Sequence, residues 1–251
     1  MEETKKRIEQ IANQGYKLNP ETILGQIAEN YKKIALYAGF LILVFSFFLF
    51  SGTFLGLIYY FGMEKFLEMI KPENLKPEKF SENFKLLYSI ASIIFTALIS
   101  PFSAGFIKMA YCADRDQEFT TASMFDYYST KYFKNIFLAT LTITLFNTLI
   151  SSTFELIGLP IVSVLATLLI SFFTIMTLPL IIFGNLNAFD AIKSSMLIIS
   201  KEPVFIASIT IISMVIALFG FVIFIIGFIF TIPFLYSMYY IFYKEIIGFS
   251  D

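Results

Sequence analysis

The chain has 251 residues, of which 57% are hydrophobic and 15% are charged, with a formal net charge of −1. Because a soluble domain carries about 25% charged residues, this composition excludes an ordinary soluble protein and makes lipid part of the solvent. The near-zero charge gives no electrostatic basis for binding nucleic acid. The chain also lacks histidine, the commonest metal ligand and general base.

The first 33 residues are polar and predict two helices. Residues 4–12 suit a short amphipathic helix that would end at Gly15. Asn19 and Pro20 then form a helix start, because asparagine caps free backbone N–H groups and proline suits the first helical position. We expect residues 1–33 to form a cytoplasmic amphipathic segment whose second helix lies at the membrane surface and runs into the first span. A solvated lead-in helix and a docking site explain this pattern equally well.

Six apolar segments are long enough to cross a bilayer, whose hydrocarbon core needs about 20 helical residues. The last two come from one run of 40 uncharged residues, Val204 to Tyr243, which as a single helix would be about 60 Å long. This run must fold back, and the turn is expected between Gly220 and Gly227. The predicted fold is all-α, with a single polytopic transmembrane domain over residues 34–248 built from three antiparallel hairpins. The predicted spans are residues 34–62, 86–109, 136–157, 159–183, 204–222 and 226–246.

The first predicted hairpin carries two local signals. Gly52 and Gly56 form a small-xxx-small pair, which would allow a neighbouring helix to approach closely. Pro101 lies inside the second span, where it removes a backbone hydrogen bond. Ser100 or Ser103 is expected to satisfy the carbonyl that this proline leaves free.

Two segments between the spans are predicted to be amphipathic helices at the cytoplasmic membrane interface. The first covers residues 120–132 and the second covers residues 187–200. The apolar face of the second is predicted to consist of Phe189, Ile192, Met196 and Ile199.

Both interfacial segments contain a polar residue followed three positions later by an aspartate. Ser123 with Asp126 matches Asn187 with Asp190, a variant of the capping box that indicates a degenerate internal repeat. One interpretation is helix capping and docking on the membrane. The other is a platform for a partner protein or lipid head groups. The candidate platform consists of Phe125, Asp126, Tyr128, Phe189, Asp190 and Lys193.

Small polar residues recur at helical spacing along the third and fourth predicted spans. In an antiparallel hairpin they lie at matching depth, so they would form a polar seam between the two helices. Such residues let helices approach and form hydrogen bonds across the contact. The seam is interpreted either as structural packing or as a polar path or ligand groove. Its candidate residues are Thr140, Thr144, Asn147, Ser151, Ser163, Thr167, Ser171 and Thr174.

The distribution of basic residues predicts the orientation. With six spans both termini share a side, and that side holds 13 of the Lys and Arg residues while the other holds 5. The positive-inside rule then places both termini and both interfacial helices in the cytoplasm. The single cysteine, Cys112, would face a reducing compartment.

The sequence predicts no catalytic site, cofactor or metal. Ion- and proton-coupled carriers usually hold an ionisable residue at mid-membrane, and we find none. Glu155 lies three residues from a predicted turn, so it is expected at the outer interface. Asp114, Asp116, Glu118 and Asp126 are close in sequence, but their spacing fits no calcium loop.

Several short stretches of the chain form a recognisable pattern. They are Leu178–Leu180, Phe189–Ser195, Gly220–Gly227, Ile232–Phe234 and Tyr240–Gly248. This pattern resembles a broad family of uncharacterised six-span bacterial inner-membrane proteins, related to the membrane domain attached to some glycerophosphodiester phosphodiesterases. The resemblance implies a fold and a bacterial inner-membrane location but no reaction.

Three functional hypotheses follow from the sequence, and a membrane enzyme ranks third. The leading one is a non-enzymatic subunit or accessory factor of a membrane assembly, for example in protein export or envelope biogenesis, with the lipid bilayer and another integral membrane protein or complex as partners. The alternative is a carrier or lipid-handling protein that uses the polar seam between the third and fourth spans. A sealed core with an exposed aromatic flank would favour the first, and a polar cavity at mid-depth would favour the second.

Overall fold

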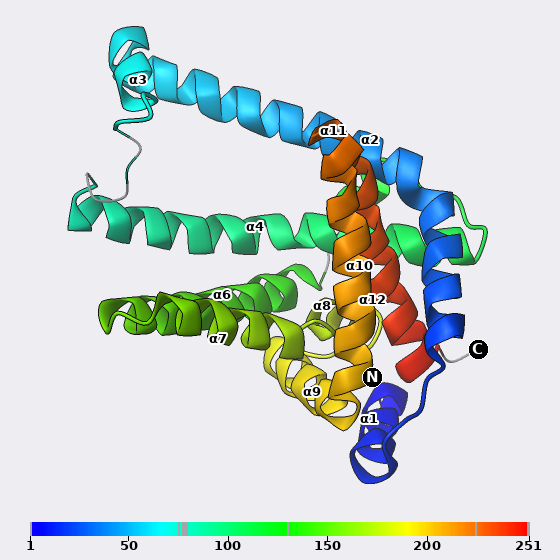
Figure 1. Ribbon diagram of the computed structural model, residues 1–251. Coiled ribbons are helices and arrows are strands. Elements are labelled where there is room, and N and C mark those ends of the chain that lie inside the picture. The colour runs from blue at the N-terminus through cyan, green and yellow to red at the C-terminus, as the bar shows by residue number, and fades with distance from the viewer. Residues whose placement is uncertain (1, 75, 77–79, 130, 224, 250–251) are drawn as a thin grey trace.

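The computed structural model describes residues 2–74, 76, 80–129, 131–223 and 225–249. Within them every regular element is a helix, as predicted (Figure 1). Five helical segments are long and apolar enough to cross a membrane, so the chain suits a multi-span helical membrane protein. These segments are Pro20–Phe61, Glu82–Asp114, Phe133–Leu156, Pro160–Ile182 and Pro203–Val222.

The two N-terminal helices form as the sequence predicts. Helix α1 (Glu2–Gln14) ends at Gly15, whose φ of +69° suits glycine. Helix α2 (Pro20–Phe61) begins at the predicted cap, where the Asn19 side-chain oxygen accepts a hydrogen bond from the Glu21 N–H at 3.0 Å. Helix α2 is continuous and bends along its length in Figure 1. The predicted surface helix therefore does run into the first span.

The second span belongs to a longer helix than predicted. After the short helix α3 (Met63–Met69), helix α4 (Glu82–Asp114) continues through Pro101. The Ser100 hydroxyl donates to the Ala97 carbonyl at 2.8 Å, which is the carbonyl that the proline leaves without its helical donor. The prediction that a neighbouring serine satisfies this carbonyl is confirmed.

The prediction of one interfacial helix over residues 120–132 is wrong. The segment forms a short 3₁₀ turn, η2 (Ala122–Phe125), followed by a single turn of helix, α5 (Asp126–Ser129), while residue 130 lies outside the described part. Both turns pack against α4 and bury Met124 and Tyr127. Contact with α4, which helical spacing alone does not reveal, decides the shape of this segment.

The predicted hairpin of the third and fourth spans is confirmed. Helices α6 (Phe133–Leu156) and α7 (Pro160–Phe173) pack together and are joined through Gly158, whose φ is +76°. The fourth span is interrupted after α7, and the chain resumes as helix α8 (Thr177–Ile182).

Helix α9 (Ala188–Lys201) is the second predicted interfacial helix, and its cap is confirmed because the Asn187 side-chain oxygen accepts a hydrogen bond from the Asp190 N–H at 2.9 Å. Its predicted apolar face is divided between exposed and buried positions. Phe189 and Met196 are 58% and 48% exposed. The residues of α9 that are buried against its neighbours are Ala188, Ala191, Ser195, Ile198 and Ile199.

The predicted sixth span, residues 226–246, is not present as one helix. The chain turns back after α10 (Pro203–Ile223), near the predicted place, although residue 224 lies outside the described part. It then forms α11 (Ile225–Thr231) and α12 (Pro233–Ile246), which are separated because Pro233 has no N–H to continue the helix. Helix α10 runs crosswise to α4 in Figure 1, so the predicted arrangement of three antiparallel hairpins is only partly observed.

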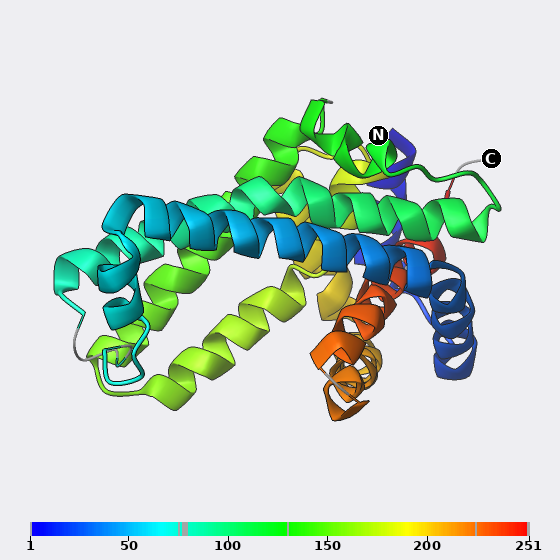
Figure 2. The same cartoon turned by 90° about the horizontal axis from the view of Figure 1, so that it is seen from above.

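The core lies at the end of the molecule where the termini meet, and α12 runs through it. Tyr240 and Phe242 are fully buried there, and the Arg7 guanidinium donates to the Ile246 carbonyl at 3.2 Å. Away from this end the helices separate. Figure 1 shows α2 and α4 diverging toward α3, and Figure 2 shows α2 lying over α4.

Candidate functional site

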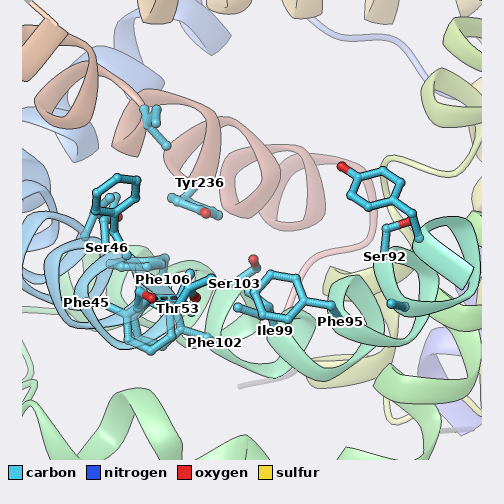
Figure 3. A pocket seen from close by; sticks show the side chains of 16 residues that line it. Phe45, Ser46, Thr53, Ser92, Phe95, Ile99, Phe102, Ser103, Phe106 and Tyr236 are labelled. Carbon is cyan, nitrogen blue, oxygen red and sulfur yellow. Dashed lines mark hydrogen bonds between the residues drawn. The ribbon is translucent and has the colours of Figure 1, made fainter. Parts of the chain in front are cut away.

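A large open groove lies between α2 and α4 and is closed at one end by the start of α12 (Figure 3). It has a volume of about 890 Å³. Each long helix contributes one stripe, because residues three or four positions apart share a helix face. The lining residues are Ile42, Phe45, Ser46, Leu49, Phe50 and Thr53 of α2; Tyr88, Ala91, Ser92, Phe95, Ile99, Phe102, Ser103 and Phe106 of α4; and Ile232 and Tyr236.

Aromatic rings close the inner end of the groove. The rings of Phe45 and Phe102 stack with centroids 4.0 Å apart, which joins α2 to α4. Phe106 stacks on Tyr236 of α12 at 4.9 Å and meets Phe102 edge to face at 5.0 Å. Phe106 is 1% exposed, so this end of the groove is continuous with the core and rigidly packed.

The polar atoms of the groove are hydroxyls. At the outer end, the Thr53 and Ser92 hydroxyls donate to carbonyls of their own helices, Leu49 at 2.8 Å and Ser89 at 2.9 Å. At the inner end, the hydroxyls of Ser103 and Tyr236 line the groove. No described residue lining the groove is charged.

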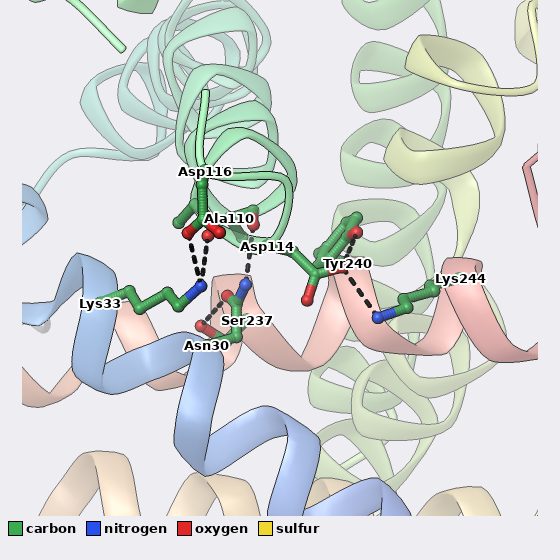
Figure 4. Close-up of polar contacts among 9 residues, drawn as sticks. Asn30, Lys33, Ala110, Asp114, Asp116, Ser237, Tyr240 and Lys244 are labelled. Atoms are coloured by element: carbon green, nitrogen blue, oxygen red, sulfur yellow. Dashed lines mark hydrogen bonds and ion pairs between the residues drawn. The ribbon is translucent and has the colours of Figure 1, made fainter. Parts of the chain in front are cut away.

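A buried polar cluster joins α2, α4 and α12 near the end of α4 (Figure 4). The Asn30 amide donates to the Ala110 carbonyl at 2.7 Å, and its oxygen accepts from the Ser237 hydroxyl at 2.8 Å. Asn30 and Ser237 are 3% and 0% exposed. Because every polar atom named here has a partner, we interpret the cluster as a structural contact that holds α2, α4 and α12 together.

Ion pairs flank this cluster. The Asp114 carboxylate accepts from the Tyr240 hydroxyl at 2.7 Å and pairs with Lys244 at 2.8 Å. Lys33 pairs with Asp116 at 2.9 Å on the exposed side. The two carboxylates are thus paired with different lysines, and Figure 4 shows them on opposite sides of the Asn30 cluster.

The structure does not unite the candidate platform. Phe125 and Asp126 belong to η2 and α5, which pack on α4, whereas Phe189 and Asp190 belong to α9, which packs on α1. Both phenylalanines are exposed and Lys193 is exposed beside the second one.

The polar groups of this predicted platform are largely used within the chain. Asp126 pairs with Lys108 at 2.7 Å, and Asp190 pairs with Lys5 at 3.4 Å. The Tyr128 hydroxyl donates to the Leu98 carbonyl at 2.9 Å. Next to Asp126, burial raises the pKa of the Tyr127 phenol, so that this group stays neutral.

The polar seam is only partly formed as predicted. The hydroxyls of Ser151 and Ser163 lie 2.8 Å apart and bond across the hairpin. The hydroxyls of Thr144, Thr167 and Thr174 instead donate to carbonyls of their own helices. For the rest of the seam, Thr140 and Asn147 are half-buried, Ser171 is exposed, and the buried Asn147 side-chain oxygen has no hydrogen-bond partner.

Two features of the site were not identified from the sequence. Asn30 interrupts the apolar stripe of Ile23, Ile27 and Ile34, and a buried polar residue in such a stripe was the available signal. The groove had no comparable signal, because its lining residues look like ordinary membrane-helix residues.

No protein-family model, curated protein or solved structure matches this chain.

Proposed function

We propose that this protein is a non-enzymatic, lipid-handling membrane protein that binds a hydrocarbon chain in the groove between α2 and α4. The observation that carries the proposal is the groove itself, an open cavity of about 890 Å³ between two candidate spans. Its walls are apolar with a few hydroxyls, which is the composition of small-molecule sites. Lipid chains surround such a groove at high concentration in a bilayer.

The size of the groove favours a lipid over a helix of a partner protein. A membrane-spanning helix about 10 Å wide and 30 Å long occupies roughly 2,400 Å³. The groove volume is well below this and lies within the range of about 300–1,000 Å³ of small-molecule sites. This proposal keeps the lipid-handling hypothesis but moves the site from the seam of α6 and α7 to the groove.

Lipid analysis of the purified protein tests the proposal. The intact chain would be extracted in mild detergent, and its bound lipids would be identified by native mass spectrometry. Ala91→Phe fills the groove, and Ile94→Phe adds a ring to an exposed position on α4 that does not line it. We expect Ala91→Phe alone to lose the bound lipid. Equal lipid content in both variants and the parent would refute the groove as a binding site.

A second function, the subunit or accessory factor, is favoured by the exposed aromatic flank of α2. Four aromatic side chains of α2 are between 64% and 94% exposed, namely Phe47, Phe48, Tyr59 and Tyr60. Only 6% of the residues in the 18-residue apolar stretch of this helix are buried. A large exposed apolar patch can mark an interaction site, although lipid also covers such a surface. A stoichiometric membrane partner recovered in a mild-detergent pull-down would support this function, and recovery of the chain without a partner would refute it.

We also propose a bacterial inner-membrane location with both termini in the cytoplasm. The bond between Arg7 and the Ile246 carbonyl supports placing both termini on one side. In a Cys112→Ala background, a cysteine introduced at Glu73 is expected to react with an impermeant reagent in whole cells, whereas one at Asp190 is not. The reverse labelling pattern would overturn the orientation.

A further inference from the structure

The hydroxyls of the groove occur at two levels. Ser103 and Tyr236 lie at the closed inner end, together with Ser46 of α2 (Figure 3). Ser46 and Ser103 each follow a member of the stacked Phe45–Phe102 pair, so the two serines lie at nearly the same level. Three helices therefore supply one hydroxyl each to this end.

The hydroxyls at the outer end are less available to a ligand than those at the inner end. Thr53 and Ser92 donate their protons to carbonyls of their own helices. At the inner end the hydroxyls of Ser46, Ser103 and Tyr236 line the groove. An apolar chain end placed there would offer these donors no partner, whereas a hydroxyl or carbonyl oxygen would accept a proton from one of them.

A charged head group does not suit this inner end. No described lining residue carries a charge, and an ion removed from water without a counter-charge is costly. The aromatic wall of Phe45, Phe102 and Phe106 offers rings and edges rather than ionic partners.

We infer that the groove selects an uncharged long-chain lipid with one small oxygen-bearing head, such as a long-chain alcohol, and holds it head-first. The head bonds to the hydroxyls of Ser46, Ser103 and Tyr236, and the chain runs along α4 toward Ser92 and Tyr88. From Ser103 to Tyr88 this path covers about 22 Å at 1.5 Å per residue, most of the hydrocarbon depth of one bilayer. The inference rests on the proposed function and adds the class and the direction of the ligand.

Photolabelling of the intact protein in bilayer vesicles tests this inference. Two hexadecanol probes carry a diazirine either beside the hydroxyl or at the far end of the chain, and a phosphatidylcholine probe carries one at its chain end. We expect the first probe to label peptides around Ser103 and Tyr236, and the second to label peptides around Tyr88 and Ser92. Unlabelled hexadecanol should compete, and phosphatidylcholine should not.

Two serine variants supply the matched comparison. Ser46→Ala removes an inner hydroxyl and should weaken hexadecanol binding about fivefold, the effect of one ordinary hydrogen bond. Ser51→Ala removes a hydroxyl of the same helix that does not line the groove, so binding should stay unchanged. Reversed labelling, inner-end labelling by the phosphatidylcholine probe, or equal effects of the two variants would overturn the head-first assignment. Absence of groove labelling by all three probes would instead refute the proposed function.

Discussion

The two halves of α4 have similar apolar character but very different surroundings. Near the loop, Leu86 and Leu87 are 63% and 66% exposed, whereas Phe106 and Ile107 toward the other end are almost completely buried. The buried half contains Ala104, Gly105 and Ala110, and the exposed half contains mostly large side chains. Because lipid is as apolar as leucine, apolar character alone does not bring membrane helices together, and small residues that permit close contact do.

Hydrogen bonding differs between the two regions in the same way. At the packed end, side chains bond between segments far apart in the sequence, as Asn30 of α2 does to Ala110 and Tyr16 of the link between α1 and α2 does to the Ile198 carbonyl at 3.2 Å. On the diverging part of α2 and α4, the Thr53 and Thr96 hydroxyls bond to carbonyls of their own helices. The packed end is therefore held by specific contacts, and the diverging helices leave space that a ligand can enter.

The largest expected effect comes from a pair of glycine substitutions. A Cβ at Gly105 would lie 2.7 Å from the backbone oxygen of Met124, whereas a Cβ at Gly52 would meet nothing within 4 Å. We expect Gly105→Leu to lower the free energy of unfolding by about 3 kcal/mol or more, because the backbone of η2 cannot move aside easily. Gly52→Leu should be neutral or slightly stabilising. Thermal unfolding in detergent measures both, and similar losses would show that the two regions do not differ in packing.

The next largest effect is expected in the buried polar cluster of Asn30, Ala110 and Ser237. Asn30→Leu removes the bonds to Ala110 and Ser237 and leaves the Ser237 hydroxyl without its acceptor. We expect a loss of about 2 kcal/mol, from the missing bonds and the unpaired buried group. Thr53→Val is the control on the diverging part and should change stability little. Unfolding measurements that give equal losses would contradict the distinction between cross-helix and same-helix bonds.

The sequence was sufficient to predict the features that depend only on residues close together in the chain. Caps at Asn19 and Asn187, the turn at Gly158 and the serine beside Pro101 were all predicted from short-range chemistry. The five candidate spans also follow from length and hydropathy, which depend on no neighbour.

What the sequence did not predict depends on packing between distant segments. The segment around Met124 is shaped by contact with Gly105. The apolar character of residues 226–246 predicts a span, but Pro233 divides this segment and the core surrounds its second part. The groove could not be predicted, because it depends on how far α2 diverges from α4. Asn147 and the two phenylalanines of the proposed platform were assigned from spacing, which gives a helix face but not its neighbours.

The two ion pairs that flank the Asn30 cluster differ in exposure, so their contributions to stability can be compared. Lys244 and Asp114 have side chains 33% and 27% exposed, and Lys33 and Asp116 have side chains 48% and 85% exposed. We expect Asp114→Asn to cost about 1 kcal/mol, because this carboxylate also accepts from Tyr240. Asp116→Asn should leave the unfolding temperature unchanged, since exposed pairs contribute little. Thermal unfolding at low and high salt measures both variants. An equal loss of stability in both would show that the exposure of an ion pair does not determine its contribution.

The smallest expected effect is in the seam between α6 and α7. Ser151→Ala removes the hydroxyl bond to Ser163, which crosses from α6 to α7. The free energy of unfolding should fall by about 0.6 kcal/mol, the average for polar contacts between membrane helices. Asn147→Leu should cost no more, because the buried side-chain oxygen has no partner to lose. Unfolding in detergent measures the stability of both variants, and lipid content measures their function. A large loss of stability in Asn147→Leu would show that this amide has an unrecognised structural role. Normal stability with lost lipid binding would place the ligand at the seam and would refute the groove.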